Sequence, residues 1–198
     1  MGILFIAASP TAHSRSAALA AAAGRELGLL GQEPVTLVLR ELAAEPLLRA
    51  EAAHPALAAA VRQVAEARAV VIATPIYKAA YSGLLKVFLD LLPGDALRGK
   101  IVLPMATGGS PSHLLALDYA LQPVLSALGA RDVLDAVFVA DAQATQRAGG
   151  GYEFDADTVR RVGKAARALA VRLSGPPTQP APAGSRVAAA VPLARCSA

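Results

Sequence analysis

Three short polar segments of the sequence each follow an apolar run, and the first carries residues suited to binding a phosphate. Residues 9–16 place several hydroxyl groups and one arginine directly before an alanine-rich stretch. A helix N-terminus offers unpaired N–H groups and a positive dipole end, hydroxyls donate to phosphate without adding charge, and arginine adds a charge-assisted hydrogen bond. The candidate phosphate-binding residues are Ser9, Thr11, Ser14, Arg15 and Ser16.

An ordinary N-cap is the alternative interpretation of these serines, because serine and threonine are favoured at that position of any helix. The place of the segment, directly after the first apolar run, favours the phosphate site. The segment lacks the G-x-G-x-x-G fingerprint of a dinucleotide site.

The second polar segment follows the apolar run 69–74 and has the residues to lie along a flat ring. Pro75, Ile76, Tyr77 and Lys78 can present backbone N–H groups and apolar surface to an aromatic ligand. The ammonium of Lys78 could stabilise negative charge on a reduced ring. Tyr77 lies four residues from Tyr81, so the two could flank one ligand if the chain turns between them. The alternative is a pair of half-buried packing tyrosines beside a solvated lysine.

The third polar segment comprises Thr107, Gly108, Gly109 and Ser110, and Pro111 follows at the first position of a helix. Paired glycines permit a close approach between the backbone and the edge of a ligand, although a tight turn also favours glycine.

The sequence offers little support for a metal site or for a catalytic nucleophile. The three histidines, His13, His54 and His113, lack the spacing of metal ligands. The sequence has no G-x-S-x-G, no H-E-x-x-H and no paired cysteine motif. Asp90 and Asp118 fall on helices as solvated or capping groups, so no acid is assigned a catalytic role.

Alternating strands and helices must position the three segments. Strand-like runs rich in Val and Ile occur at residues 3–8, 35–39, 69–74, 101–106 and 133–139. Helical stretches occur at residues 14–30, 55–67, 82–92, 112–128 and 156–173. This rhythm is typical of βαβ units, in which the strands are buried on both faces of a parallel sheet. We therefore predict an α/β, flavodoxin-like fold with a five-stranded parallel sheet in the order 2-1-3-4-5 and helices on both faces.

In that strand order a ligand binds at the carboxyl ends of the first and third strands, where the winding reverses. The segments at Ser9 and Thr74 follow those two strands, and the segment at Thr107 follows the neighbouring fourth strand. We therefore expect the three segments to form one site for a flat, phosphorylated cofactor.

The 198 residues and their composition predict one domain, residues 1–173, followed by a mobile, Pro- and Ala-rich tail, residues 174–198. Although 55% of the residues are hydrophobic, no run approaches the roughly 18 apolar residues of a spanning helix. The start lacks the basic residues of a signal peptide, which favours a cytoplasmic protein outside the membrane. A net charge of +4 without a basic stripe argues against nucleic acid, and the one cysteine excludes an internal disulfide.

Three stretches resemble the NAD(P)H-dependent FMN reductases, in particular those that serve two-component alkanesulfonate monooxygenases. They are Thr74-Pro-Ile-Tyr-Lys-Ala-Ala-Tyr-Ser-Gly83, Leu103-Pro-Met-Ala-Thr-Gly-Gly109 and His113-Leu-Leu-Ala-Leu-Asp-Tyr-Ala-Leu-Gln-Pro-Val-Leu125. The likeness runs from about residue 3 to residue 138. The first loop departs from the family, with Ala8 where glycine is usual and Thr11 where arginine is common.

The resemblance implies a fold, two cofactors and partners. It implies FMN on the three segments named above, hydride transfer from NAD(P)H to the flavin, and reduced flavin supplied to a flavin-dependent monooxygenase in sulfonate assimilation. It also implies a homodimer or homotetramer. No acid–base residue of the family carries over, which suits direct hydride transfer between two bound rings.

The helical stretch 112–128 has an irregularity that the sequence predicts. Tyr119 lies on the face opposite one apolar stripe, which is formed by Leu114, Leu117, Leu121, Val124, Leu125 and Leu128. Pro123 lacks the N–H that would bond the carbonyl of Tyr119, and a π-bulge is one remedy. In the resembling sulfonate reductases a tyrosine here lies in such a bulge at a subunit interface and is linked to flavin release. Tyr119 is proposed to act in the same way; an exposed tyrosine beside a proline kink is the alternative.

Two other functions remain open. One is an enzyme that keeps FMN as a prosthetic group and reduces quinones, azo dyes or chromate. The other is a flavodoxin-like electron carrier without turnover, although carriers are usually acidic and this chain carries a net charge of +4.

Overall fold

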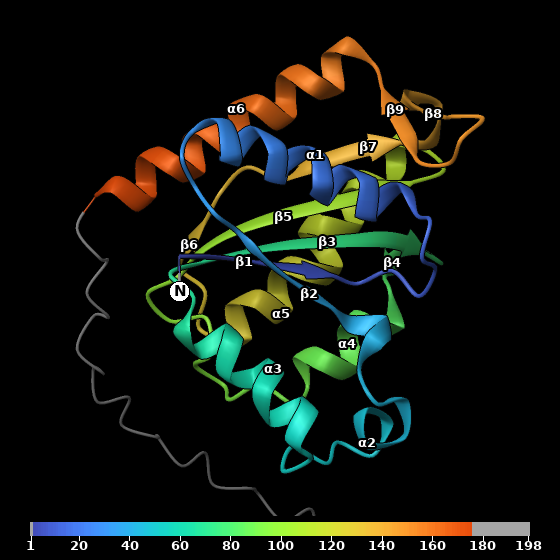
Figure 1. Cartoon of the computed structure of the whole chain (residues 1–198). Helices are drawn as coiled ribbons and strands as arrows, with labels where there is room; N and C mark the ends of the chain where they lie inside the picture. The colour runs from blue at the N-terminus through green and yellow to red at the C-terminus, as the bar shows by residue number, and fades with distance from the viewer. Residues whose placement is uncertain (1, 176–198) are drawn as a thin grey trace, which may run out of the picture.

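The computed structural model describes residues 2–175, and its central sheet has the predicted order and direction. All of its long strands run parallel in the order β2, β1, β3, β5, with β6 and β7 together at the far edge (Figure 1). These strands are β1 (Ile3–Ala7), β2 (Val35–Val38), β3 (Ala69–Tyr77), β5 (Ile101–Gly108), β6 (Asp132–Val133) and β7 (Val137–Ala140). The predicted flavodoxin-like fold is confirmed.

Helices cover both faces of the sheet, as the alternation of buried side chains along each strand requires. Along β1, Ile3 and Phe5 pack against the face covered by α1 (Arg15–Leu29) and α6 (Ala156–Ser174), and Leu4 and Ile6 point to the other face. That other face is covered by three helices, α3 (Pro55–Glu66), α4 (Gly83–Leu89) and α5 (Gln122–Ala127) (Figure 1). Burial on both faces explains why the strands read as continuous apolar runs.

The fifth predicted strand, residues 133–139, is divided in the structure. β6 ends at Val133 and β7 begins at Val137, although the N–H of Leu134 still donates to the carbonyl of Val102 (2.8 Å). An edge strand has a neighbour on one side only, so an interruption such as exposed Asp135 costs fewer hydrogen bonds there than in the middle of the sheet. The prediction of one continuous strand was wrong for this reason.

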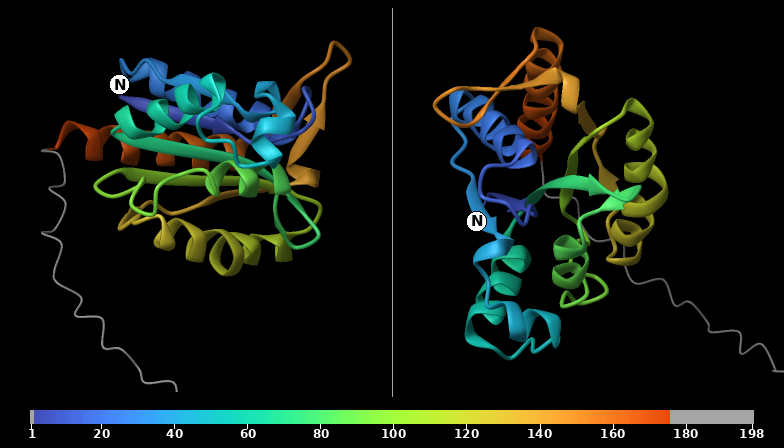
Figure 2. Two further views of the ribbon diagram at one scale, coloured as in Figure 1. Left: turned by 90° about the horizontal axis from the view of Figure 1, so that it is seen from below. Right: turned by 90° about the vertical axis from the view of Figure 1, so that its right-hand side faces the viewer.

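Several short elements were not predicted. They are α2 (Ala44–Leu48), β4 (Ala80–Tyr81), the hairpin of β8 (Ala144–Gln146) and β9 (Tyr152–Phe154), and single turns at Leu39–Glu41 and Asp141–Gln143. The glycines 149–151 between two short β-prone runs were the available signal for the hairpin. The hairpin extends past the carboxyl end of the sheet and lies beside α1 (Figure 2).

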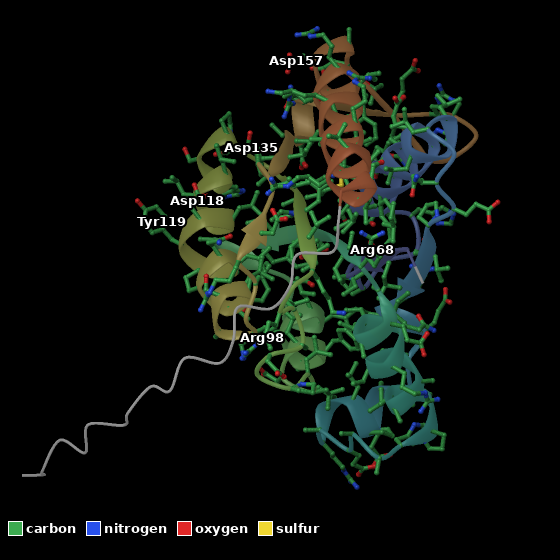
Figure 3. The ribbon with its side chains drawn as sticks, turned by 90° about the vertical axis from the view of Figure 1, so that its left-hand side faces the viewer. Arg68, Arg98, Asp118, Tyr119, Asp135 and Asp157 are labelled. Atoms are coloured by element: carbon green, nitrogen blue, oxygen red, sulfur yellow. The ribbon has the colours of Figure 1, made fainter. Side chains whose placement is uncertain are left out.

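The predicted irregularity of residues 112–128 is confirmed. A turn of 3₁₀ helix at Pro111–Leu114 leads into a π-helix at Leu117–Leu121, and the N–H of Gln122 donates to the carbonyl of Leu117, five residues back. The π-helix accommodates Pro123, which has no N–H to donate. Tyr119 is 79% exposed on the outer surface, next to Asp118 (Figure 3).

Most of the predicted tail, residues 176–198, lies outside the described residues. Among residues 2–175, no helix combines the length and apolar character needed to cross a bilayer. The same residues contain no group of three or more His, Cys, Asp or Glu side chains placed to hold a metal ion.

Candidate functional site

The three predicted polar loops meet at the carboxyl edge of the sheet, because they follow the adjacent parallel strands β1, β3 and β5. The N–H of Ala8 donates to the carbonyl of Ala73 (2.9 Å), and Pro75 is the register partner of Thr107. The right-hand view of Figure 2 looks onto this edge, with the β8–β9 hairpin beside α1. The candidate residues from three distant parts of the sequence are therefore brought together.

In the first loop the hydroxyl groups bond mainly to one another and to the start of α1. Ser9 Oγ and Thr11 Oγ1 are 3.1 Å apart, and Ser14 Oγ lies 3.3 Å from Ser16 Oγ. Ser14 is also the N-cap, since its Oγ accepts a hydrogen bond from Ala17 N–H (3.1 Å). Ser9 and Ser16 are buried and Thr11 is exposed. Hydroxyl groups that share hydrogen bonds in this way can rotate to donate to an anion.

Arg15 has a different environment from its neighbours in the loop. Its Nη1 lies 3.4 Å from Asp141 Oδ2, and its guanidinium stands 5.2 Å above the ring centre of Tyr152. Its Nε is buried and has no hydrogen-bond partner. The first loop is thereby connected to the turn Asp141–Gln143 and to β9. No pattern in the sequence indicates this connection.

The second loop is the tip of a tight hairpin between β3 and β4. Ile76 is paired with Tyr81 and Tyr77 with Ala80, and the two turn residues, Lys78 and Ala79, have φ values of 50° and 62°. Directly paired residues of an antiparallel ribbon lie on the same face, so Tyr77 and Tyr81 lie on opposite faces. The prediction that the two tyrosines flank one ligand was wrong for this reason.

The two tyrosines also differ in exposure. Tyr77 is 48% exposed, beside Lys78 at the tip of the hairpin. Tyr81 packs against the core on the α3–α5 face, and this partial burial raises the pKa of its phenol. Ile76, on the same face as Tyr81, is buried.

A buried hydrogen-bonded cluster joins the first loop to the second. Ser82 Oγ donates to the carbonyl of Ala8 (2.6 Å) and accepts from Leu85 N–H (3.1 Å), which makes Ser82 the N-cap of α4. Ser82 N–H donates to Thr74 Oγ1 (3.0 Å). We call Ala8, Thr74 and Ser82 the buried corner; each is at most 1% exposed. Sequence reasoning noted where Thr74 and Ser82 stand but missed that they hold two loops together.

The third loop uses its two glycines differently. A Cβ atom at Gly108 would lie 2.9 Å from His113 Nδ1 and 3.3 Å from Phe138, so the protein's own packing requires glycine there. A Cβ at Gly109 would meet nothing within 4 Å, and Gly109 is exposed. Thr107 is buried, and Ser110 Oγ accepts from Ser112 N–H (3.2 Å). The surface open to a ligand is therefore at Gly109 and Ser110, and His113 Nδ1 is buried nearby without a partner.

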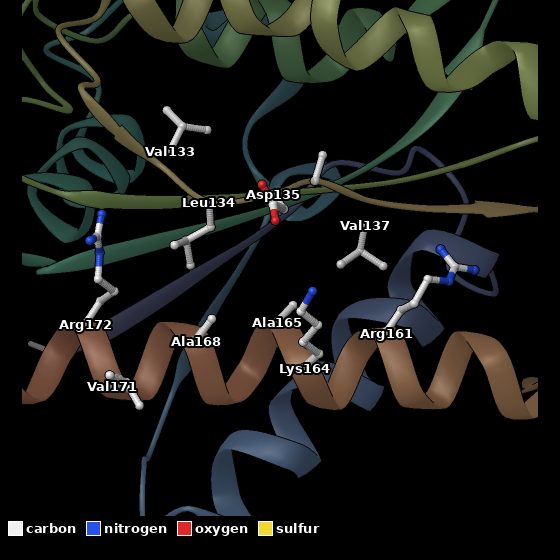
Figure 4. Close-up of a pocket in the computed structure, with 11 residues that line it drawn as sticks. Val133, Leu134, Asp135, Val137, Arg161, Lys164, Ala165, Ala168, Val171 and Arg172 are labelled. Carbon is white, nitrogen blue, oxygen red and sulfur yellow. The ribbon is translucent and has the colours of Figure 1, made fainter.

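A cavity of about 550 Å³ lies elsewhere, between the interrupted edge strand and α6. Figure 4 shows its apolar floor, with Asp135 on one side and Lys164, Arg161 and Arg172 on the helix. None of the predicted site residues lines this cavity, so it is separate from the carboxyl-edge site.

Comparisons with known proteins agree with the fold. The family model for NADPH-dependent FMN reductase matches residues 1–145. The chain is 50% identical to an FMN reductase (NADPH) of Escherichia coli K12 over 143 residues, which are 72% of this chain and 75% of that protein. It is 47% identical to an FMN reductase (NADPH) of Pseudomonas putida, over 72% of this chain and 73% of that protein. Among solved structures, an apo NADH:FMN oxidoreductase (EMOB) matches with a TM-score of 0.78 and 37% identity, over 90% of this chain and 93% of that one.

Proposed function

The chain belongs to the NADPH-dependent FMN reductase family, and from this premise we propose that its three carboxyl-edge loops form the FMN site. Membership makes the protein an oxidoreductase that uses FMN and NAD(P)H. One observation carries the proposed site: the three polar loops meet at one edge of the sheet. These loops contain all of the predicted site residues.

The residues present fit the two ends of FMN. We assign the phosphate to Ser9, Thr11, Ser14, Arg15 and Ser16, because hydroxyl donors and a guanidinium at a helix start suit a dianion. We assign the ring to Pro75, Ile76, Tyr77 and Lys78 on one side and to Thr107, Gly108, Gly109 and Ser110 on the other. Two details support the fit: the open space above Gly109 and the buried Nδ1 of His113 that lacks a partner.

When bound, FMN supplies a ring that accepts hydride from NAD(P)H. The residues of the chain have the task of aligning two rings to about 3–3.5 Å and holding them there. The β3–β4 hairpin is suited to this task because its tip is fixed by a two-residue turn and by the buried corner. Lys78 lies at that tip, and we assign to its ammonium the role of stabilising negative charge on the reduced ring.

We further propose that the reduced flavin leaves the protein and serves a flavin-dependent monooxygenase of sulfonate assimilation. The support is the likeness of residues 74–83, 103–109 and 113–125 to reductases of that kind, together with the π-helix that places Tyr119 on the surface. We also propose a homodimer or homotetramer in which Tyr119 lies at an interface. An exposed aromatic side chain four residues after Leu115, which is 53% exposed, suits such a contact.

Steady-state kinetics separate released flavin from a prosthetic group. A protein that uses FMN as a substrate purifies nearly colourless and shows saturation in added FMN during NADPH oxidation. A quinone, azo-dye or chromate reductase retains its FMN and shows no dependence on added flavin. An electron carrier fails to oxidise NADPH even with excess FMN, and that result would contradict the proposed turnover.

Tyr119→Ala tests the interface and the release of flavin together. We expect a smaller assembly by light scattering and an altered rate of flavin release in stopped-flow fluorescence. Val171→Ala is the matched control, because Val171 is 71% exposed on α6. If Tyr119→Ala leaves both assembly and release as in the unsubstituted protein, Tyr119 does not have this role.

A further inference from the structure

The first loop has one arginine, and that arginine is already paired. Residues 9–16 contain no lysine, so Arg15 is the strongest cation available to a phosphate in this loop. Its guanidinium instead contacts Asp141 (3.4 Å) and lies over Tyr152 (5.2 Å). We call Arg15, Asp141 and Tyr152 the charged latch. The side chains of Arg15 and Asp141 are 37% and 41% exposed, so the ion pair borders solvent.

The acidic partner is held firmly in place. Asp141 begins the turn Asp141–Gln143 directly after β7, and Gln143 Oε1 accepts from Ala140 N–H (3.2 Å) and from Arg161 Nη2 (3.3 Å). Arg161 Nη1 also donates to the carbonyl of Phe138 (2.6 Å). The backbone on both sides of Asp141 is thereby anchored to α6, and this anchoring keeps Asp141 next to Arg15.

A phosphate bound at the first loop must therefore share Arg15 with the carboxylate of Asp141. Shared donors are weakened for each acceptor, and the like charges of the carboxylate and the phosphate repel each other. We propose that Asp141 is an affinity-determining residue: it restrains Arg15 and lowers the affinity for the phosphate end of FMN, which favours release of the flavin. This inference rests on the proposed assignment of the phosphate to residues 9–16.

Asp141→Asn removes the competing charge and keeps the size of the side chain. The affinity for FMN, measured as a dissociation constant by quenching of flavin fluorescence, is expected to rise about fivefold, the effect of a partly exposed ion pair. The affinity for riboflavin, which has no phosphate, stays within about twofold of the unsubstituted protein. Asp141→Glu, which retains the charge, stays near the unsubstituted value for both flavins.

Two further variants test whether the gain in affinity of Asp141→Asn comes from Arg15 or from the change in net charge. Asp135→Asn changes the net charge equally, at an exposed position that lines the cavity beside α6, which includes no residue of the first loop, and leaves the dissociation constant for FMN unchanged. In the Arg15→Gln background, Asp141→Asn yields less than half of its gain, because the arginine that it frees is gone. Thermal unfolding of each variant checks that it is folded.

Several results would overturn the inference. They are an unchanged or weakened affinity of Asp141→Asn for FMN, an equal gain for riboflavin, an equal gain from Asp135→Asn, or a full gain in the Arg15→Gln background. Unsubstituted protein that binds neither flavin would overturn the proposed site, and this inference with it. Binding of both flavins without any effect of Asp141→Asn would overturn this inference alone.

Discussion

The first loop is held on its two sides by different kinds of interaction. On the side of the second loop, the buried corner uses hydroxyl and backbone groups that are at most 1% exposed and carry no charge. On the side of the β8–β9 hairpin, the charged latch uses an ion pair and a cation–π contact at the border with solvent. The comparison teaches that the proposed ring side of the site is fixed by burial, whereas the proposed phosphate side is open to adjustment by charge.

The energies of the two kinds of contact support this difference. Leaving a buried donor or acceptor without a partner costs about 1–3 kcal/mol, whereas an exposed ion pair contributes about 0.2–1 kcal/mol and is screened by salt. Substitutions in the buried corner should therefore change stability, and substitutions in the charged latch should mainly change ligand affinity.

Ser82→Ala is expected to have the largest effect. It removes the N-cap of α4 and leaves the buried carbonyl of Ala8 without its donor, so the free energy of unfolding falls by about 2–3 kcal/mol. Urea denaturation measures the loss. Ser174→Ala is the control, since Ser174 Oγ bonds to the carbonyl of Ala170 in an exposed position and its removal should cost less than about 0.5 kcal/mol. Equal losses for both serines would show that the hydrogen bonds of the buried corner contribute no more to the free energy of unfolding than an exposed one does.

The two glycines of the third loop separate packing from ligand contact on the ring side. Gly108→Ala forces a Cβ to within 2.9 Å of His113 Nδ1 and should cost about 1–3 kcal/mol of stability. Gly109→Ala meets no atom within 4 Å and should leave the urea midpoint unchanged. If Gly109 borders the flavin ring, its substitution weakens FMN and riboflavin equally. Stability loss at Gly109, or a difference between the two flavins, would contradict this division.

Arg15→Gln tests the stability contribution of the charged latch. The ion pair with Asp141 and the contact with Tyr152 are partly exposed, so their loss should lower the free energy of unfolding by about 1 kcal/mol at low ionic strength. In about 1 M salt, where the Debye length is about 3 Å, the difference should shrink. Ser82→Ala should show no such dependence on salt. A loss at Arg15 as large as that at Ser82 would remove the distinction between the two sides.

The sequence was sufficient for the parts of this comparison that depend on periodicity and on strand order. Apolar runs predicted the sheet, strand order placed the three loops at one edge, and Pro123 predicted the π-helix around Tyr119. Contacts between distant segments could not be predicted in the same way. The bond from Ser82 to Ala8 spans 74 positions, and the contact of Arg15 with Tyr152 depends on a hairpin whose strands have only three residues each.

The opposite faces of Tyr77 and Tyr81 show a second limit. The four-residue spacing was compatible with a turn, but the faces depend on which residues form pairs across the hairpin. A two-residue turn with positive φ at Lys78 and Ala79 is unusual without glycine or asparagine, so its sequence gave no warning. The prediction for the two tyrosines failed because the pairing across the hairpin, and not their spacing in the sequence, decides which face each one occupies.

The smallest expected effect is a dependence on pH that only the phosphate side should show. Asp155, the N-cap of α6, accepts hydrogen bonds from Thr158 N–H (2.7 Å) and from Gln143 Nε2 (3.2 Å), the residue that anchors the turn of Asp141. The hydrogen bonds from Thr158, with a smaller contribution from Gln143, hold the pKa of this carboxyl below its usual value. A lowered pKa stabilises the fold above the pKa of the unfolded chain, about 3.9, and the contribution is lost as the pH falls through the folded-state value.

Asp155→Asn retains a good N-cap but cannot titrate, so it isolates the charge. The urea midpoint of the unsubstituted protein should exceed that of Asp155→Asn at pH 6, and the difference should shrink at pH 3. The difference between the unsubstituted protein and Ser82→Ala should be the same at both pH values, because neither Thr74 nor Ser82 titrates. A difference for Asp155→Asn that persists unchanged at pH 3 would mean that the charge of the carboxylate is not its source, and that charge does not distinguish the hairpin side from the buried corner.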